Sequence, residues 1–199
     1  MLRFFVILLC GFLVSCAANP GLDHLADHSA RWGSRKIHYS LPGGVDYFGA
    51  GPVEAVTYPT DRDFPLMCLV AGTGWGQSRA QPAIHQVNVD LFVIKLSRPR
   101  IFGKPDAEVW QGILRQEQVS RLPTKTMDRL MTDARGQTWL EMQLLSPRSQ
   151  AIEARSYVRP VGVDELLLLR LSFGDYATDI DRAQALSVQD RMLQSLWVE

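Results

Sequence analysis

The stretch ELLLLRLSF (Glu165–Phe173) decides the expected fold, because four consecutive leucines leave no polar face. A strand with one face in water alternates apolar and polar residues, whereas a strand covered on both faces is apolar throughout. The run Leu166–Leu169 therefore predicts a central strand in a sheet that is covered on both sides.

Two pairs of strand-like segments around this run predict antiparallel hairpins. In each pair, a short connection containing Gly separates two segments of strand length. In one arm, Glu141 and Gln143 lie on the face opposite to the apolar residues. The expected hairpin arms are Thr126–Thr132 with Gln137–Ser146, and Ala151–Arg159 with Glu165–Phe173.

Earlier strands and two helices complete the expected architecture. Apolar residues recur at every second position in the strands and at helical spacing in the helices. The expected strands are Lys36–Leu41, Glu54–Tyr58, Leu66–Ala71 and Val87–Leu96, and the expected helices are Asp106–Gln118 and Thr178–Trp197. Thr178 and Asp181 resemble a capping box. The pattern predicts an α+β domain, with a mostly antiparallel sheet and an internal and a C-terminal helix packed on it.

The first residues resemble a bacterial lipoprotein signal. Arg3 precedes the apolar run Phe4–Val14, which has the length of a secretory signal. The run is shorter than the roughly 20 apolar residues of a transmembrane helix. It ends at Leu13-Val14-Ser15-Cys16, which resembles the lipobox of bacterial lipoproteins.

The lipobox resemblance implies where the protein is located. Residues 1–15 would be removed as a signal peptide, together with Cys10, and Cys16 would carry the lipid that binds the membrane. An Asp after the lipidated cysteine tends to retain a Gram-negative lipoprotein in the inner membrane, and residue 17 is Ala. The resemblance therefore implies a protein anchored in the outer membrane and facing the periplasm.

The residues that follow Cys16 are rich in small and polar side chains. Pro20 and Gly21 interrupt regular structure, so residues 16–34 are expected to form the lipidated cysteine and a flexible tether, with a short helix at Leu22–Ala30 as an alternative. Residues 35–199 are expected to form one globular domain.

Charge and cysteine content exclude some classes of protein. The 21 Lys and Arg residues balance the 21 Asp and Glu residues, so the chain lacks the basic surface of a nucleic-acid-binding protein. Cys68 lies in the apolar run Pro65–Val70. A cysteine in that setting is expected to be a buried, unreactive thiol rather than a redox or intermolecular one.

The order of elements from Lys36 to Glu199 resembles that of PsbP-like and DcrB-like domains, several of which are bacterial lipoproteins. The resemblance rests on Ser40-Leu41-Pro42-Gly43-Gly44 near the start and Leu193-Gln194-Ser195-Leu196 at the end. The segment between Pro42 and Val87 departs from the pattern. The resemblance implies a binding or accessory role and supplies no catalytic residues.

Several residues are candidates for metal or cofactor sites. His24 and His28 lie beside acidic residues, but two ligands in a tether seldom form a zinc site. Gly72, Gly74 and Gly76 have the spacing of a turn or loop rather than of a dinucleotide-binding motif. No cofactor and no metal are expected.

The catalytic alternatives depend on two isolated histidines. His38 and His85 lie in or near expected strands, and the sequence contains no G-x-S-x-G, S-x-x-K or C-x-x-C motif. Distant residues can still form a triad in space, which leaves an envelope hydrolase as one alternative. A carrier of a small apolar ligand is another.

The favoured interpretation is a non-catalytic binding or accessory module of the cell envelope, such as a subunit of an envelope complex or an immunity-type inhibitor. A protein is its expected partner. The expected contact residues are Trp75, Tyr47 and Phe48, which lie among the Gly-rich and Pro-rich segments between Pro42 and Gln86.

Overall fold

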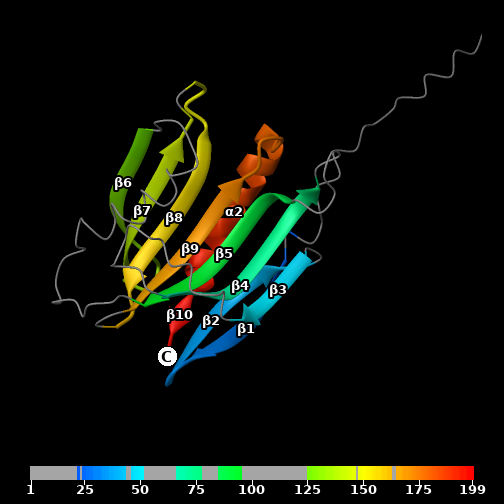
Figure 1. Cartoon of the computed structure of the whole chain (residues 1–199). Helices are drawn as coiled ribbons and strands as arrows, with labels where there is room; N and C mark the ends of the chain where they lie inside the picture. The colour runs from blue at the N-terminus through cyan, green and yellow to red at the C-terminus, as the bar shows by residue number, and fades with distance from the viewer. Residues whose placement is uncertain are drawn as a thin grey trace, which may run out of the picture.

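The computed structural model in Figure 1 describes ten strands and one helix of the chain. The described residues are 22, 24–43, 46–51, 66–77, 85–95, 125–146, 148–162 and 165–199. The expected strand Glu54–Tyr58 and the expected internal helix Asp106–Gln118 lie outside them. Within the described residues, no helix is long and apolar enough to cross a membrane.

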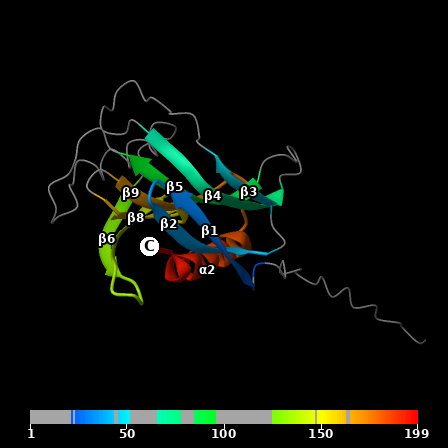
Figure 2. The same cartoon turned by 90° about the horizontal axis from the view of Figure 1, so that it is seen from below.

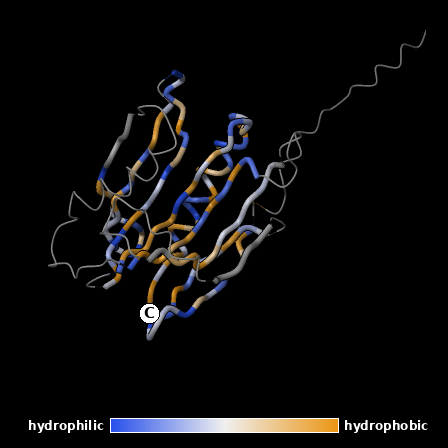
Figure 3. Tube along the Cα trace, in the orientation of Figure 1, coloured by the Kyte–Doolittle hydropathy of each residue, from blue (hydrophilic) through white to orange (hydrophobic). Residues whose placement is uncertain are grey.

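Seven strands form one antiparallel sheet. In spatial order they are β3 (Asp46–Gly51), β4 (Leu66–Gln77), β5 (His85–Lys95), β9 (Glu165–Phe173), β8 (Ile152–Pro160), β7 (Thr138–Leu145) and β6 (Lys125–Thr132). Both predicted hairpins, β6–β7 and β8–β9, are present. Figure 3 shows hydrophobic residues along these strands and hydrophilic residues at the turn between β7 and β8.

The prediction for the leucine run is confirmed, because β9 lies inside the sheet between β5 and β8. Leu167, Leu169 and Leu171 belong to one buried cluster, whereas Leu166 and Leu168 belong to another. Alternate side chains of a strand point to opposite faces, so the two clusters lie on opposite faces of the sheet.

A second sheet has three strands, in the order β1 (Leu25–Trp32), β2 (Arg35–Pro42) and β10 (Trp197–Val198). The tether prediction is therefore wrong for Leu25–Trp32, and so is the alternative of a helix there. Each residue of β1 is paired with one of β2, from Leu25 opposite Pro42 to Trp32 opposite Arg35. Strand pairing, rather than burial of a strongly apolar face, orders this polar segment.

The C-terminal helix α2 (Asp179–Ser195) agrees with the prediction, including the capping box. The Thr178 hydroxyl oxygen accepts from the Asp181 amide, and the Asp181 carboxylate accepts from the Thr178 amide. Figure 2 shows α2 and the small sheet on the same side of the large sheet. Ala185, Val188 and Met192 join the buried cluster on that side.

The confirmed architecture is thus a mostly antiparallel β-sheet with a C-terminal helix packed on it. The described part of the chain places α2 over β9 and β5 and beside β2. Strands β8, β7 and β6 continue the sheet beyond the helix (Figure 1). Side chains on this side of β8 reach the flank of α2.

Candidate functional site: a buried polar network between sheet and helix

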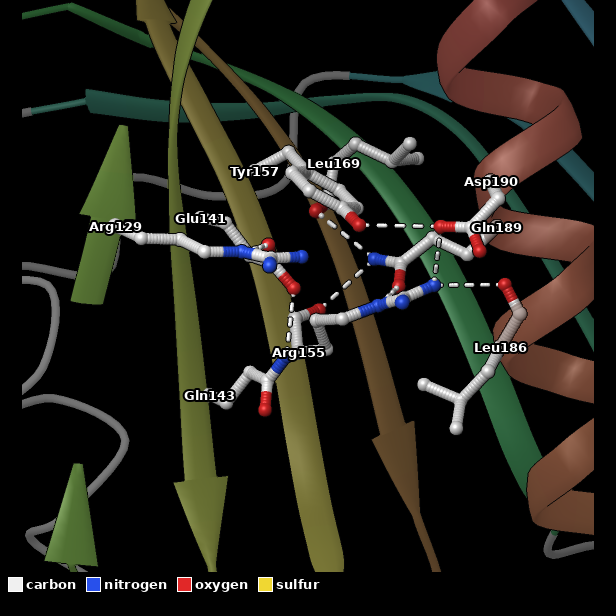
Figure 4. Close-up of polar contacts among 9 residues, drawn as sticks. All are labelled: Arg129, Glu141, Gln143, Arg155, Tyr157, Leu169, Leu186, Gln189 and Asp190. Atoms are coloured by element: carbon white, nitrogen blue, oxygen red, sulfur yellow. Dashed lines mark hydrogen bonds and ion pairs between the residues drawn. The ribbon is translucent and has the colours of Figure 1, made fainter. Parts of the chain in front are cut away.

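The centre of the network is Gln189 of α2, whose side chain is fully buried against the sheet (Figure 4). Its Nε2 donates to the carbonyl oxygens of Arg155, at 2.9 Å, and Leu169, at 3.3 Å. Its Oε1 accepts from Arg155 Nε at 2.6 Å. One amide thus connects α2 to both β8 and β9.

Arg155 carries the buried positive charge of the network. Its Nη2 donates to the Leu186 carbonyl oxygen and to Asp190 Oδ1, both at 2.7 Å. The Asp190 side chain is half exposed, so the ion pair lies at the solvent boundary of the network. At this position the Asp190 carboxylate keeps part of its hydration. The ion pair therefore costs less desolvation free energy than it would in the core.

Tyr157 donates its hydroxyl to the same Asp190 oxygen, at 3.1 Å. Burial raises the pKa of Tyr157 well above its ordinary value, and the neighbouring Arg155 only partly opposes this. The phenol is therefore a neutral donor at every physiological pH. It can orient a carboxylate but supplies no phenolate as a base.

Glu141 of β7 is the centre of a neighbouring polar cluster (Figure 4), with 1% of its side chain exposed. Its carboxylate accepts from Arg129 Nε and from Gln143 Nε2, the latter at 2.6 Å. The hydrogen bond to Glu141 raises the pKa of Arg129. A carboxylate that already accepts from a cation and an amide is a poor general base, because its lone pairs are engaged.

A further ion pair, partly buried, lies on the opposite face of the sheet. Arg170 of β9 donates to Asp90 of β5 at 3.1 Å, and its guanidinium lies over the Phe92 ring. Burial raises the pKa of Asp90, whereas Arg170 opposes that shift. Each buried charge described here therefore has a charged partner, as stability requires.

His38, one of the two predicted catalytic candidates, lies on β2 in the small sheet. The His38 ring stacks on Trp197 of β10 with 3.9 Å between ring centroids, and its Nε2 lies 3.1 Å from Glu199 Oε2. The contacts described for His38 are thus to an acid and to an aromatic ring.

His85 begins β5 and packs against the backbone of β4. A Cβ atom on Gly74 would lie 2.7 Å from the His85 ring, so this position requires glycine. The predicted loop Gly72–Gly76 is wrong, because these residues continue β4. Glycine here makes room for a neighbouring ring rather than for a turn.

Among the expected contact residues, Trp75 is not exposed. Its side chain is 6% exposed and belongs to the core cluster on the helix side. The expectation of a surface contact is therefore wrong for Trp75, since β4 lies between β3 and β5 rather than in a loop. Tyr47 and Phe48 lie on β3, opposite Thr73 and Gly72, and their contact role remains a prediction.

Cys68 is buried and free, in agreement with its predicted location. Burial raises the pKa of its thiol. The His28 ring stacks on Tyr39 at 5.7 Å, and His24 is exposed. Across the ranges that the structure describes, no three His, Cys, Asp or Glu residues gather as a metal site.

The structure also reveals exposed apolar residues that the sequence analysis did not select. The described residues include three large hydrophobic side chains in solvent: Leu130, Tyr176 and Ile180. Two of them flank Thr178, the N-cap of α2. The sequence contains one signal for the exposure of Tyr176, because this residue lies in the connection Gly174–Thr178 between a buried strand and a helix. Such connections run over the protein surface.

Comparison with protein-family models, with curated proteins and with solved structures found no match to this chain. The protein class is therefore defined by its own geometry: an antiparallel β-sheet domain closed by a C-terminal helix, with a buried polar network that joins the two. The likeness to lipoprotein signals and to PsbP-like and DcrB-like domains rests on the residues quoted above.

Proposed function

We propose that this protein is a lipid-anchored binding module of the bacterial cell envelope. The anchor is Cys16, in the lipobox Leu13-Val14-Ser15-Cys16. By the same resemblance, Ala17 favours the outer membrane, with the domain in the periplasm. The module acts by holding a protein partner near the membrane and carries out no reaction of its own.

The observation that carries this proposal is the position of Leu22. It is 3% exposed and packs in the core, and its carbonyl oxygen accepts from Arg191 of α2. The six residues from Cys16 to Leu22 span at most about 20 Å when fully extended. Lipid on Cys16 would therefore keep the domain close to the bilayer surface.

A short connection favours binding over catalysis as the reason for anchoring. Confinement to a thin layer raises the effective concentration of the domain toward any protein in the same layer. The buried charged groups have structural partners: Glu141 accepts from Arg129 and Gln143, and Arg155 donates to Gln189 and Asp190.

The anchor is tested with cysteine variants of the full chain. Cys16→Ser should abolish incorporation of a tagged fatty acid and release the protein from the membrane fraction. Cys10→Ser is the matched control, since Cys10 belongs to the expected signal peptide, and it should label like the parent. Equal labelling of Cys16→Ser would refute the anchor. Ala17→Asp should move the protein to the inner membrane on a density gradient.

The binding role is tested by chemical crosslinking of the anchored protein in its own envelope. A specific adduct is expected, and it should weaken in the unanchored Cys16→Ser form. A parallel screen against ester, peptide and glycan substrates uses His38→Ala and His85→Ala as controls. Turnover that either substitution abolishes, together with no adduct, would favour the hydrolase instead.

A further inference from the structure

Two large apolar side chains project into solvent on either side of the N-cap of α2. Tyr176 is 72% exposed and Ile180 is 57% exposed. Tyrosine is among the residues that most often dominate the energy of protein interfaces. The core gains little from either side chain, so burial within the domain does not explain them.

The backbone that presents Tyr176 is fixed by a buried side chain. Its amide donates to Gln86 Oε1 at 2.9 Å, and the Gly174 amide donates to the Gln86 carbonyl oxygen at 2.8 Å. A Cβ atom on Gly174 would lie 2.7 Å from Gln86 Oε1, so a larger residue would displace the Gln86 amide that accepts from Tyr176. An ordered backbone reduces the entropy lost when the side chain binds a partner.

The charges of the segment that carries the two side chains are mainly acidic. Asp175, Asp179 and Asp181 lie within the segment Gly174–Arg182, and Arg182 is its one basic residue. The Arg182 guanidinium is engaged, because it donates to the Ile152 carbonyl oxygen and covers the Phe173 ring. Favourable interaction with the helix dipole accounts for Asp179 and Asp181, but not for the exposure of the apolar side chains.

We infer that Tyr176 and Ile180, rimmed by Asp175 and Asp179, form the surface through which this module binds its partner. The inference rests on the proposed function and names the kind of partner. The acidic rim fits a protein with an apolar pocket surrounded by Lys or Arg. The same rim repels anionic lipid headgroups, so this surface binds a protein rather than the membrane.

The location of this surface fits an anchored module. Leu22, the first described residue, contacts Arg191 near the other end of α2. At 1.5 Å per helical residue, Ile180 lies about 17 Å from Arg191 along the helix axis. The proposed surface is therefore well separated from the point where the chain enters the domain.

The test uses photo-crosslinking amino acids placed singly at positions 176, 180 and 130 of the anchored protein. Position 130 is the control, because Leu130 is equally exposed but lies on β6. Adducts are expected from 176 and 180 and not from 130. The crosslinked partner peptide, identified by mass spectrometry, should contain apolar residues beside Lys or Arg.

Substitutions separate this surface from the general binding role. With a lysine-reactive crosslinker, Tyr176→Ala/Ile180→Ser should reduce the adduct at least tenfold, and Asp175→Lys should reduce it several-fold. Leu130→Ser should change it less than twofold. An undiminished adduct in the double variant, with unchanged thermal unfolding, would overturn the surface and leave the binding module standing.

Two other outcomes bear on the partner. No adduct from the parent protein under any condition would overturn the proposed function and this surface together. Cosedimentation of the protein lacking lipid (Cys16→Ser) with vesicles containing phosphatidylglycerol, lost in Tyr176→Ala/Ile180→Ser, would overturn the protein partner in favour of the membrane.

Discussion

Gln189 and Arg155 exchange two hydrogen bonds across the interface between α2 and β8. The Gln189 amide nitrogen donates to the Arg155 carbonyl oxygen at 2.9 Å, and the Arg155 Nε donates to the Gln189 amide oxygen at 2.6 Å. Both hydrogen bonds are buried. Their loss would leave donors and acceptors where water cannot replace the missing partner.

Gln189→Leu should destabilise the protein by about 2–4 kcal/mol, because it leaves Arg155 Nε without its acceptor and removes the donor to the carbonyl oxygens of Arg155 and Leu169, without creating a large cavity. The measurement is the free energy of unfolding in urea. Gln194→Leu is the control on the same helix, where the side chain is exposed, and should change stability by less than about 0.5 kcal/mol. Equal stabilities would show that the network contributes nothing.

Tyr157→Phe should reduce the sensitivity of the protein to alkaline pH. The pKa of Tyr157 is raised in the folded state, chiefly by burial, while an unfolded tyrosine titrates near pH 10. The folded state keeps the proton longer, so stability is present below about pH 10 and is lost as pH rises further, by at most about 1.4 kcal/mol per pH unit.

The experiment compares urea unfolding of the parent and Tyr157→Phe between about pH 8 and pH 11. The difference between the two curves isolates Tyr157, since all other tyrosines are shared. The same pH dependence of the free energy of unfolding in both proteins would contradict this role of Tyr157.

Two buried tryptophans should respond differently to the same substitution. Trp139 donates its Nε1 to Asp133 Oδ2 at 2.8 Å, whereas Trp75 Nε1 has no hydrogen-bond partner in the described part of the chain. Trp139→Phe should therefore cost about 1 kcal/mol more than Trp75→Phe, because it also removes a hydrogen bond to a charged group. Thermal unfolding of both variants measures the difference, and the reverse order would argue against it.

Cys68 should resist thiol reagents in the folded protein. Its side chain is buried and its thiol pKa is raised, so little thiolate is available to react. Detergent-solubilised protein should react with a chromogenic disulfide at least a hundredfold more slowly than protein in urea. Cys68→Ser supplies the background rate. Rapid reaction of the folded protein would make Cys68 a redox candidate.

The sequence predicted those elements in which local pattern and tertiary environment agree. The leucine run of β9, the two hairpins and the capping box of α2 each carry a short-range signal that the fold preserves. The predictions were wrong where contacts with another segment of the chain determine the structure. Strand β1 is polar and is ordered by pairing with β2. Gly74 lies within strand β4, where the glycine leaves room for the His85 ring and does not indicate a turn.

The alternation of apolar and polar residues in β7 does not by itself reveal the polar network, because it does not indicate whether the polar face is covered. Glu141 and Gln143 were assigned to the face opposite the apolar residues, which is correct, but that face of the sheet is also covered. The leucine run already indicated two covered faces. Extending that inference from β9 to its neighbours would have predicted that Arg155 and Glu141 are buried and need partners.

The small sheet also determines when the domain can finish folding. Strand β10 pairs with β2, and the His38 and Glu199 side chains that meet there are 161 residues apart in the sequence. The ribosome synthesises β1 and β2 long before Trp197 and Val198. These two strands therefore lack their third strand until β10 has been made. Contacts of such long range form late and slowly. The small sheet of this topology is therefore completed only after Trp197 and Val198 have been synthesised.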